Sequence, residues 1–95
     1  MNIEKIRELY NAAPEKEKPA YSELLLEIKF WRERNKREPN EEEFSKILEE
    51  TINELYEKIE FQLEMGYQEA SFKLAAKIDV LEKLTAPQAG IENEV

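Results

Sequence analysis

Residues 40–84 have the sequence NEEEFSKILEETINELYEKIEFQLEMGYQEASFKLAAKIDVLEKL, a helical tract interrupted only by Gly66. The apolar residues of this tract advance by three or four positions, which places them on one face of a helix. Asn40 and Glu43 have the spacing of a capping box, with Asn in place of Ser or Thr. The tract therefore predicts an all-α protein, in which a helix of about 25 residues starts after Asn40.

The single glycine at position 66 leaves two alternatives for this tract. Glycine costs about 1 kcal/mol relative to alanine inside a helix, and it is favoured just past a helix end. The chain could therefore turn at Gly66 or continue as one weakened helix. We favour the turn, because a chain of 95 residues offers little other surface for one long helix to cover. The prediction is an antiparallel hairpin whose second helix ends near Leu84.

Two shorter helices are predicted before the hairpin. An apolar repeat over residues 2–12 indicates the first, and Pro14 ends it because the residue before a proline is pushed out of the helical region. A second apolar stripe indicates a helix over residues 20–37, with Pro19 at its start and Pro39 beyond its end.

The length and composition fit one small domain. A chain of 95 residues with 41% hydrophobic residues can form one packed core. We expect a single four-helix domain over residues 1–84. Residues 85–95 hold one of the two glycines and few apolar residues, so we expect a flexible tail there.

The composition argues against an enzyme. The chain has no cysteine and no histidine, which removes the thiolate nucleophile, the commonest general base and the commonest metal ligand. Its serines lie outside any nucleophile motif, and no glycine-rich loop is present to hold a phosphate. Glu57, Glu60 and Glu64 share a helix face, but the Glu-x-x-His motif of di-iron bundles is missing. We expect no catalytic, cofactor-binding or metal-binding residue.

The net charge of −8 bears on the partner. Nucleic acid and anionic lipid attract basic surfaces, so both are disfavoured, whereas a protein with a basic face is permitted. No stretch approaches the ~18–20 apolar residues of a membrane span, and the start lacks the apolar core of a secretory signal. We expect a cytoplasmic protein that binds another protein, and a homo-oligomer stays open.

The charges are unevenly spread along the chain. Five basic residues lie within nine positions, namely Lys29, Arg32, Arg34, Lys36 and Arg37. We favour the interpretation that they complement the helix dipole and form salt bridges to the glutamates that follow. The alternative is a small basic patch beside Trp31 that binds tRNA or another RNA.

The acidic residues of the predicted third helix suggest another alternative. Glu54, Glu57, Glu60 and Glu64 belong to a row of negative charge over residues 41–64. Such a row could imitate DNA, so that the protein would be a phage-type inhibitor of a nucleic-acid-binding protein. This hypothesis predicts tight, salt-sensitive binding to a basic groove.

Several aromatic residues are candidates for an interaction surface. Phe30 and Trp31 are adjacent, so they cannot both face the core, and Phe61 and Phe72 fall outside the main apolar stripes. Such residues either widen a buried helix face or mark an interface with a partner, where aromatic residues are enriched. Tyr67, next to the glycine, is a further candidate.

Three stretches resemble the helical domain of the YqeY family, which is related to the tail domain of the Asn/Gln-tRNA amidotransferase B subunit. They are LLLEIK at 24–29, REPNEEE at 37–43 and IDVLEKL at 78–84, within a resemblance that covers about residues 22–87. Leu55, Tyr56 and Tyr67 stand where that family has arginines. The resemblance therefore implies the helical layout and no site residues. The composition predicts a non-enzymatic, acidic module that binds another protein, and the resemblance implies that this module is an accessory of a translation or amidotransferase complex.

Overall fold

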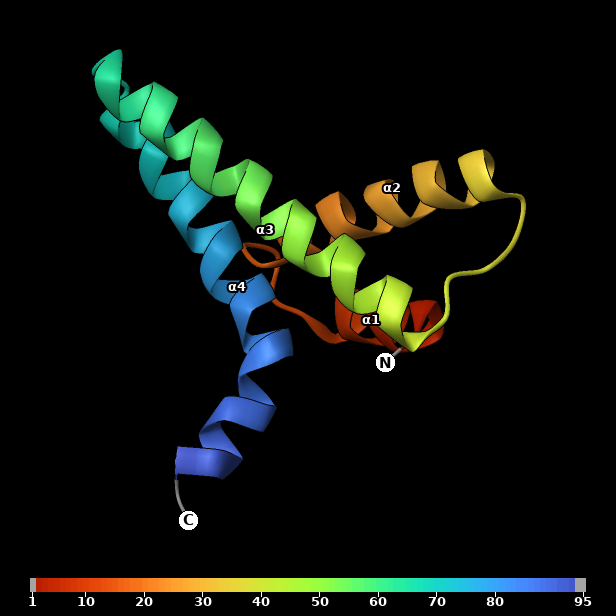
Figure 1. Ribbon diagram of the computed structural model, residues 1–95. Coiled ribbons are helices and arrows are strands. Elements are labelled where there is room, and N and C mark those ends of the chain that lie inside the picture. The colour runs from red at the N-terminus through yellow and green to blue at the C-terminus, as the bar shows by residue number, and fades with distance from the viewer. Residues whose placement is uncertain (1, 94–95) are drawn as a thin grey trace.

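The computed structural model describes residues 2–93, with side chains for residues 2–85 (Figure 1). It contains four helices: α1 (Ile3–Ala12), α2 (Lys18–Asn35), α3 (Glu41–Glu64) and α4 (Gln68–Asn93). No strand occurs in the described part of the chain, so the predicted all-α class is confirmed.

The structure places α2 two residues earlier than predicted at both ends. Pro19 lies in the first turn of α2, where its missing N–H group breaks no helical hydrogen bond. At the other end, Lys36 takes the left-handed conformation with φ 60°, and its N–H donates to the Arg32 carbonyl over 2.8 Å. The left-handed conformation of Lys36 ends the helix before residue 37. The first helix lies as predicted to within one residue, because Asn2 is the N-cap of α1.

The capping box predicted at the start of α3 is present. The Glu43 N–H donates to Asn40 Oδ1 over 2.9 Å, and the Asn40 N–H donates to Glu43 Oε1 over 3.0 Å. These two hydrogen bonds satisfy backbone donors that have no partner inside the helix. The sequence therefore fixes where α3 begins and from which direction the chain enters it.

The chain turns at Gly66. Gly66 has φ +81°, and its N–H donates to the Leu63 carbonyl over 3.1 Å. The Tyr67 N–H donates to the Gln62 carbonyl over 2.8 Å. These two bonds form a Schellman motif, which ends α3 and reverses the chain. Of the two alternatives at this glycine, the structure adopts the turn, and α4 runs back along α3 (Figure 1).

The last helix is longer than predicted. α4 continues past Leu84 to Asn93, and Figure 1 shows its last turns leaving the direction of its first part. Pro87 has no N–H group, so one helical hydrogen bond is missing there, a common cause of such a bend. The predicted helix end near Leu84 is therefore wrong. The division into a domain and a tail stays a prediction, and residues 94–95 lie outside the described residues.

Apolar side chains from all four helices form one core around α2, which contacts each of the other three helices. The buried apolar residues are Ile6 of α1, Ala20, Tyr21, Leu24 and Ile28 of α2, Phe44, Ile47, Leu48, Ile52 and Leu55 of α3, and Leu74, Ile78, Val80 and Leu81 of α4. None of residues 56–70 is buried, so the turning end of the α3–α4 hairpin projects beyond this core (Figure 1).

Candidate interaction surfaces

Large apolar side chains are exposed at the turning end of the hairpin. We call this group the apolar tip, and its members, each more than half exposed, are Phe61 (59%), Leu63 (56%), Met65 (54%), Tyr67 (54%) and Phe72 (72%). They occupy the last turn of α3, the turn itself and the first turns of α4. Apolar exposure of this density is unfavourable in water, so the apolar tip is a candidate interaction surface.

Acidic side chains surround Phe61 on α3. Glu54 and Glu57 lie seven and four positions before it, so the three share one helix face. That face points away from the core, because Phe61 is 59% exposed. With Lys58 and Gln62 these residues line a shallow depression of ≈ 370 Å³. The surface around Phe61 is thus apolar in the middle and predominantly anionic at its edge.

A second shallow depression lies at the turn and the start of α4. It has a volume of ≈ 710 Å³, and its lining includes Gly66, Tyr67, Glu69, Phe72 and Lys73. Phe72 is the most exposed of the large apolar residues. The apolar tip therefore offers aromatic rings from both helices of the hairpin, and burying such rings dominates the energetics of protein interfaces.

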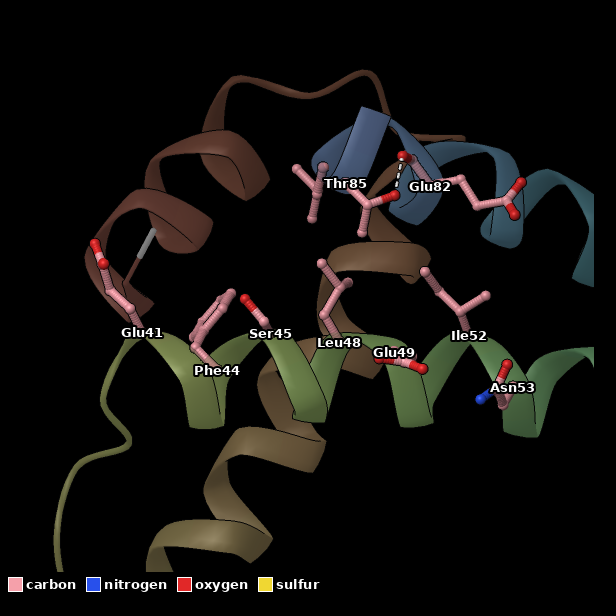
Figure 2. Close-up of a pocket in the computed structure, with 10 residues that line it drawn as sticks. Glu41, Phe44, Ser45, Leu48, Glu49, Ile52, Asn53, Glu82 and Thr85 are labelled. Carbon is pink, nitrogen blue, oxygen red and sulfur yellow. Dashed lines mark hydrogen bonds between the residues drawn. The ribbon is translucent and has the colours of Figure 1, made fainter. Parts of the chain in front are cut away.

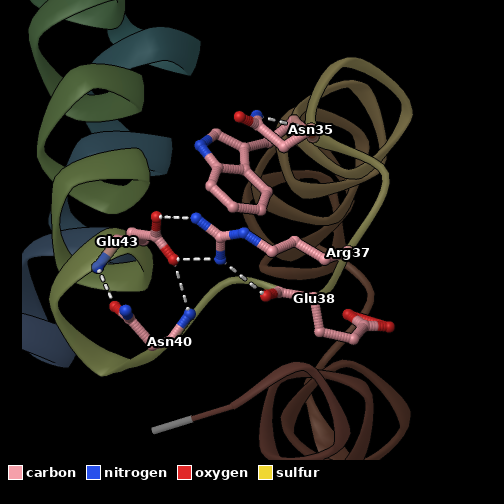
Figure 3. Close-up of polar contacts among 6 residues, drawn as sticks. Asn35, Arg37, Glu38, Asn40 and Glu43 are labelled. Atoms are coloured by element: carbon pink, nitrogen blue, oxygen red, sulfur yellow. Dashed lines mark hydrogen bonds and ion pairs between the residues drawn. The ribbon is translucent and has the colours of Figure 1, made fainter.

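The basic stretch at the end of α2 is tied to the acidic residues that follow it (Figure 3). The Arg37 guanidinium donates to both oxygens of the Glu43 carboxylate, with Nη1–Oε1 2.6 Å and Nη2–Oε2 2.5 Å. It also donates to the Glu38 carbonyl over 3.2 Å, and its Cζ lies 4.9 Å from the centre of the Trp31 ring. Arg37 thus joins the end of α2 to the N-terminus of α3 through a bidentate ion pair and a cation–π contact.

The electrostatics of this junction favour the structural interpretation of the basic stretch. The hydrogen bonds from Arg37 and from the Asn40 backbone lower the pKa of Glu43 to about 2. A second ion pair joins Arg32 Nη1 to Glu38 Oε1 over 3.1 Å. Two of the five basic groups are therefore paired with carboxylates, as the salt-bridge interpretation predicts. The paired carboxylates also make this surface less attractive to a phosphate backbone.

The remaining predicted residues differ in exposure. Trp31 is partly buried and packs against the core, whereas Phe30 is 42% exposed. Arg34 is exposed on α2. The four glutamates of the acidic row are all exposed on α3: Glu54, Glu57, Glu60 and Glu64. The structure thus brings the acidic row and Phe61 together, and it leaves Trp31 and the basic stretch at a separate place, the junction of α2 and α3.

A groove between α3 and α4 was missed from the sequence (Figure 2). It has a volume of ≈ 540 Å³, and Phe44, Leu48 and Ile52 lie along its α3 side. Leu84 and Thr85 of α4 also line it. The sequence carries no signal for it, because the groove depends on how α3 and α4 pack against each other.

One hydrogen bond connects the two helices near the groove. The Tyr56 hydroxyl donates to Glu82 Oε2 over 2.9 Å, and this bond raises the pKa of Tyr56. The bond positions the Glu82 carboxylate, which also lines the groove. Tyr56 therefore links α3 to α4.

Two kinds of site were not found within the described residues. No helix there is both long enough and apolar enough to cross a membrane. No three acidic side chains come together there in a way that could hold a metal ion.

The comparisons with known proteins give no relatives. No protein-family model matches the chain, and neither a curated protein nor a solved structure matches it.

Proposed function

We propose that this protein is a non-enzymatic interaction module that docks onto another protein through its apolar tip. The observation that carries the proposal is the exposure of five large apolar side chains within residues 61–72. The core of the molecule does not use them, because each of the five is more than half exposed. Apolar surface that does not serve folding is best accounted for by burial in a complex.

The charges around the apolar tip indicate the chemistry of its partner. Glu57, Glu60, Glu64 and Glu69 are all exposed near the tip. A second copy of the same chain would bring like charges together, which costs free energy in an interface. A partner with an apolar depression bordered by lysines and arginines would gain from both the rings and the carboxylates. We therefore propose a basic partner protein rather than a second copy.

The pathway rests on the resemblance alone. Similarity to the YqeY helical domain supports an accessory role in a translation or amidotransferase complex. A partner from that machinery would support the proposed pathway. A partner from an unrelated process would contradict the pathway, but it would leave the proposal of the apolar tip as docking surface intact.

Affinity purification with matched variants tests the docking surface. Phe61→Ser with Phe72→Ser removes two rings from the apolar tip, and Leu26→Ser with Phe30→Ser removes two exposed apolar side chains from α2. A true partner co-purifies, after nuclease treatment, with the unchanged protein and the α2 variant but not with the tip variant. Partners that all survive the tip variant would contradict the proposal.

The acidic row supports a second candidate function, a DNA mimic of the phage-inhibitor type. Glu50, Glu57 and Glu64 are exposed and follow each other by seven positions on the same side of α3, about 10.5 Å apart. A DNA mimic loses most of its affinity when Glu54, Glu57, Glu60 and Glu64 become glutamine. A module that docks through its rings loses much less, so the two variants separate the candidates.

The tRNA-binding alternative has less support, because Arg32 and Arg37 are engaged in ion pairs. Its test is a variant in which Arg32, Arg34 and Arg37 become glutamate. Loss of nuclease-sensitive RNA from the purified protein would restore this alternative, and unchanged RNA recovery would exclude it.

A further inference from the structure

We propose that the groove between α3 and α4 is a second docking site, which takes a cationic amphipathic helix of a partner protein. It lies beside the N-terminal half of α3, whereas the apolar tip lies at the opposite end of the hairpin (Figure 1). The two sites are separate, so this inference does not depend on the proposed function of the tip.

The floor of the groove is apolar and rigid. Phe44, Leu48 and Ile52 are spaced by four positions, which aligns them along one face of α3. Each also belongs to the core, with exposures of 3%, 4% and 7%. Core packing therefore holds them in place, and an apolar side chain entering the groove contacts only the narrow strip of each that stays accessible.

The length of the groove favours a helical segment over a compact small molecule. Its lining on α3 extends from Glu41 to Asn53, a distance of about 18 Å along the helix axis. Two or three apolar side chains at helical spacing on a partner could contact a floor of that length. Ser45, Asn53 and Thr85 supply neutral polar groups beside the floor, which suit the polar margin of an amphipathic helix.

The edge of the groove selects a cationic partner. Carboxylates of Glu41, Glu49 and Glu82 are among the ten described residues that line it, and none of these described residues is a lysine or an arginine. Glu41 lies at one end, and Glu49 and Glu82 lie toward the other (Figure 2). An anionic helix or a nucleic-acid strand would be repelled, as would an acidic second copy. Lysines or arginines beside the apolar stripe would meet the carboxylates of Glu49 and Glu82.

Two synthetic peptides test this inference. Both are 18-residue amphipathic helices with the same leucine stripe, and their polar faces carry either lysine or glutamate. We expect the lysine peptide, added to the ¹⁵N-labelled full chain, to shift the amide signals of Ser45, Glu49, Ile52 and Thr85. The dissociation constant should increase with salt, and the glutamate peptide should cause no shifts. Equal shifts with both peptides, no shifts with either, or shifts confined to residues 61–72 would overturn the inference.

Charge-matched variants separate the groove from the overall charge. Glu49→Lys and Glu60→Lys change the net charge equally on the same helix, but only Glu49 lines the groove. We expect Glu49→Lys to weaken binding of the lysine peptide about tenfold and Glu60→Lys to weaken it less than twofold. If both variants weakened binding equally, the effect would come from net charge alone, and this result would contradict a binding site in the groove.

An uncharged substitution that fills the groove and the tip variant complete the test. Ser45 is exposed and lines the groove, so Ser45→Trp should fill it and abolish peptide binding, while Gln68→Trp at the exposed start of α4 should not. The tip variant Phe61→Ser with Phe72→Ser should bind the lysine peptide with unchanged affinity. If it does not, the peptide binds at the tip, and the groove inference is wrong while the proposed function gains support.

Discussion

Lys36 is held in a conformation that L-amino acids disfavour. Its φ of 60° lets its N–H close the end of α2, but a side chain at this angle costs roughly 1 kcal/mol relative to glycine. We expect Lys36→Gly to raise the free energy of unfolding by about 0.5–1 kcal/mol in urea denaturation. Lys29→Gly, in the interior of α2, should lower it by about 1 kcal/mol. If both variants changed the free energy of unfolding in the same direction, the positive φ of Lys36 would not be the cause of the effect.

Glu43 makes stability depend on pH in a defined window. Its pKa is about 2 in the folded protein against an ordinary value of 4.5, because Arg37 and the Asn40 N–H bind the ionised form. A carboxyl with a lowered pKa stabilises the fold fully above pH 4.5, and this stabilisation is lost as pH falls toward 2.

The prediction compares the unchanged protein with Glu43→Gln. Glu43→Gln should be less stable at pH 7, and the difference should shrink between pH 4.5 and pH 2. Urea denaturation at five pH values measures it. A difference that stays constant over that range would show that the Arg37 ion pair contributes nothing to folding.

At the scale of helices, the two ends of the hairpin have different roles. Leu55 is 1% exposed in the core, whereas Phe61 and Phe72, farther toward the turn, are 59% and 72% exposed. We expect Phe61→Ser with Phe72→Ser to change the free energy of unfolding by less than about 0.5 kcal/mol per site, while Leu55→Ala should lower it by about 2–5 kcal/mol. Denaturant midpoints measure both. A large loss of stability in the tip variant would show that the two rings stabilise the fold, and it would contradict a role in binding alone.

Local chemistry explains which helix boundaries could be predicted. The start of α3 was predictable because Asn40 and Glu43 form a capping box within four residues. The turn was predictable because Gly66 provides a positive φ. The end of α2 was misplaced because Lys36 is not a residue type that signals a left-handed cap. The extension of α4 was missed because sparse apolar residues indicate little packing, which does not by itself exclude a helix.

At the scale of the whole molecule, the fold class could be predicted and the sites only in part. Phe61 and Phe72 were candidates because they lie off the apolar stripes; both side chains are more than half exposed, and their role in binding stays a prediction. Leu63 and Met65 were missed, since helical spacing alone does not show where the core ends along a hairpin. The groove needs Leu48 of α3 beside Leu84 of α4, 36 positions apart in the chain. Such a juxtaposition depends on tertiary packing, and helical periodicity carries no information about it.

The balance between apolar tip and acidic charge should also govern self-association. The net charge is −8 at pH 7 and approaches zero near the isoelectric point of 4.7. Repulsion between copies should keep the chain monomeric at pH 7 in low salt, and association through the exposed rings should appear near pH 4.7. Sedimentation velocity at the two pH values measures it.

Two variants locate the surface through which copies associate. Phe61→Ser with Phe72→Ser should remain monomeric at both pH values, whereas Leu26→Ser with Phe30→Ser should associate as the unchanged protein does. If the tip variant still associated at pH 4.7, the surface through which copies associate would lie outside the apolar tip. Charge repulsion would then no longer explain why the apolar tip binds a basic partner rather than a second copy.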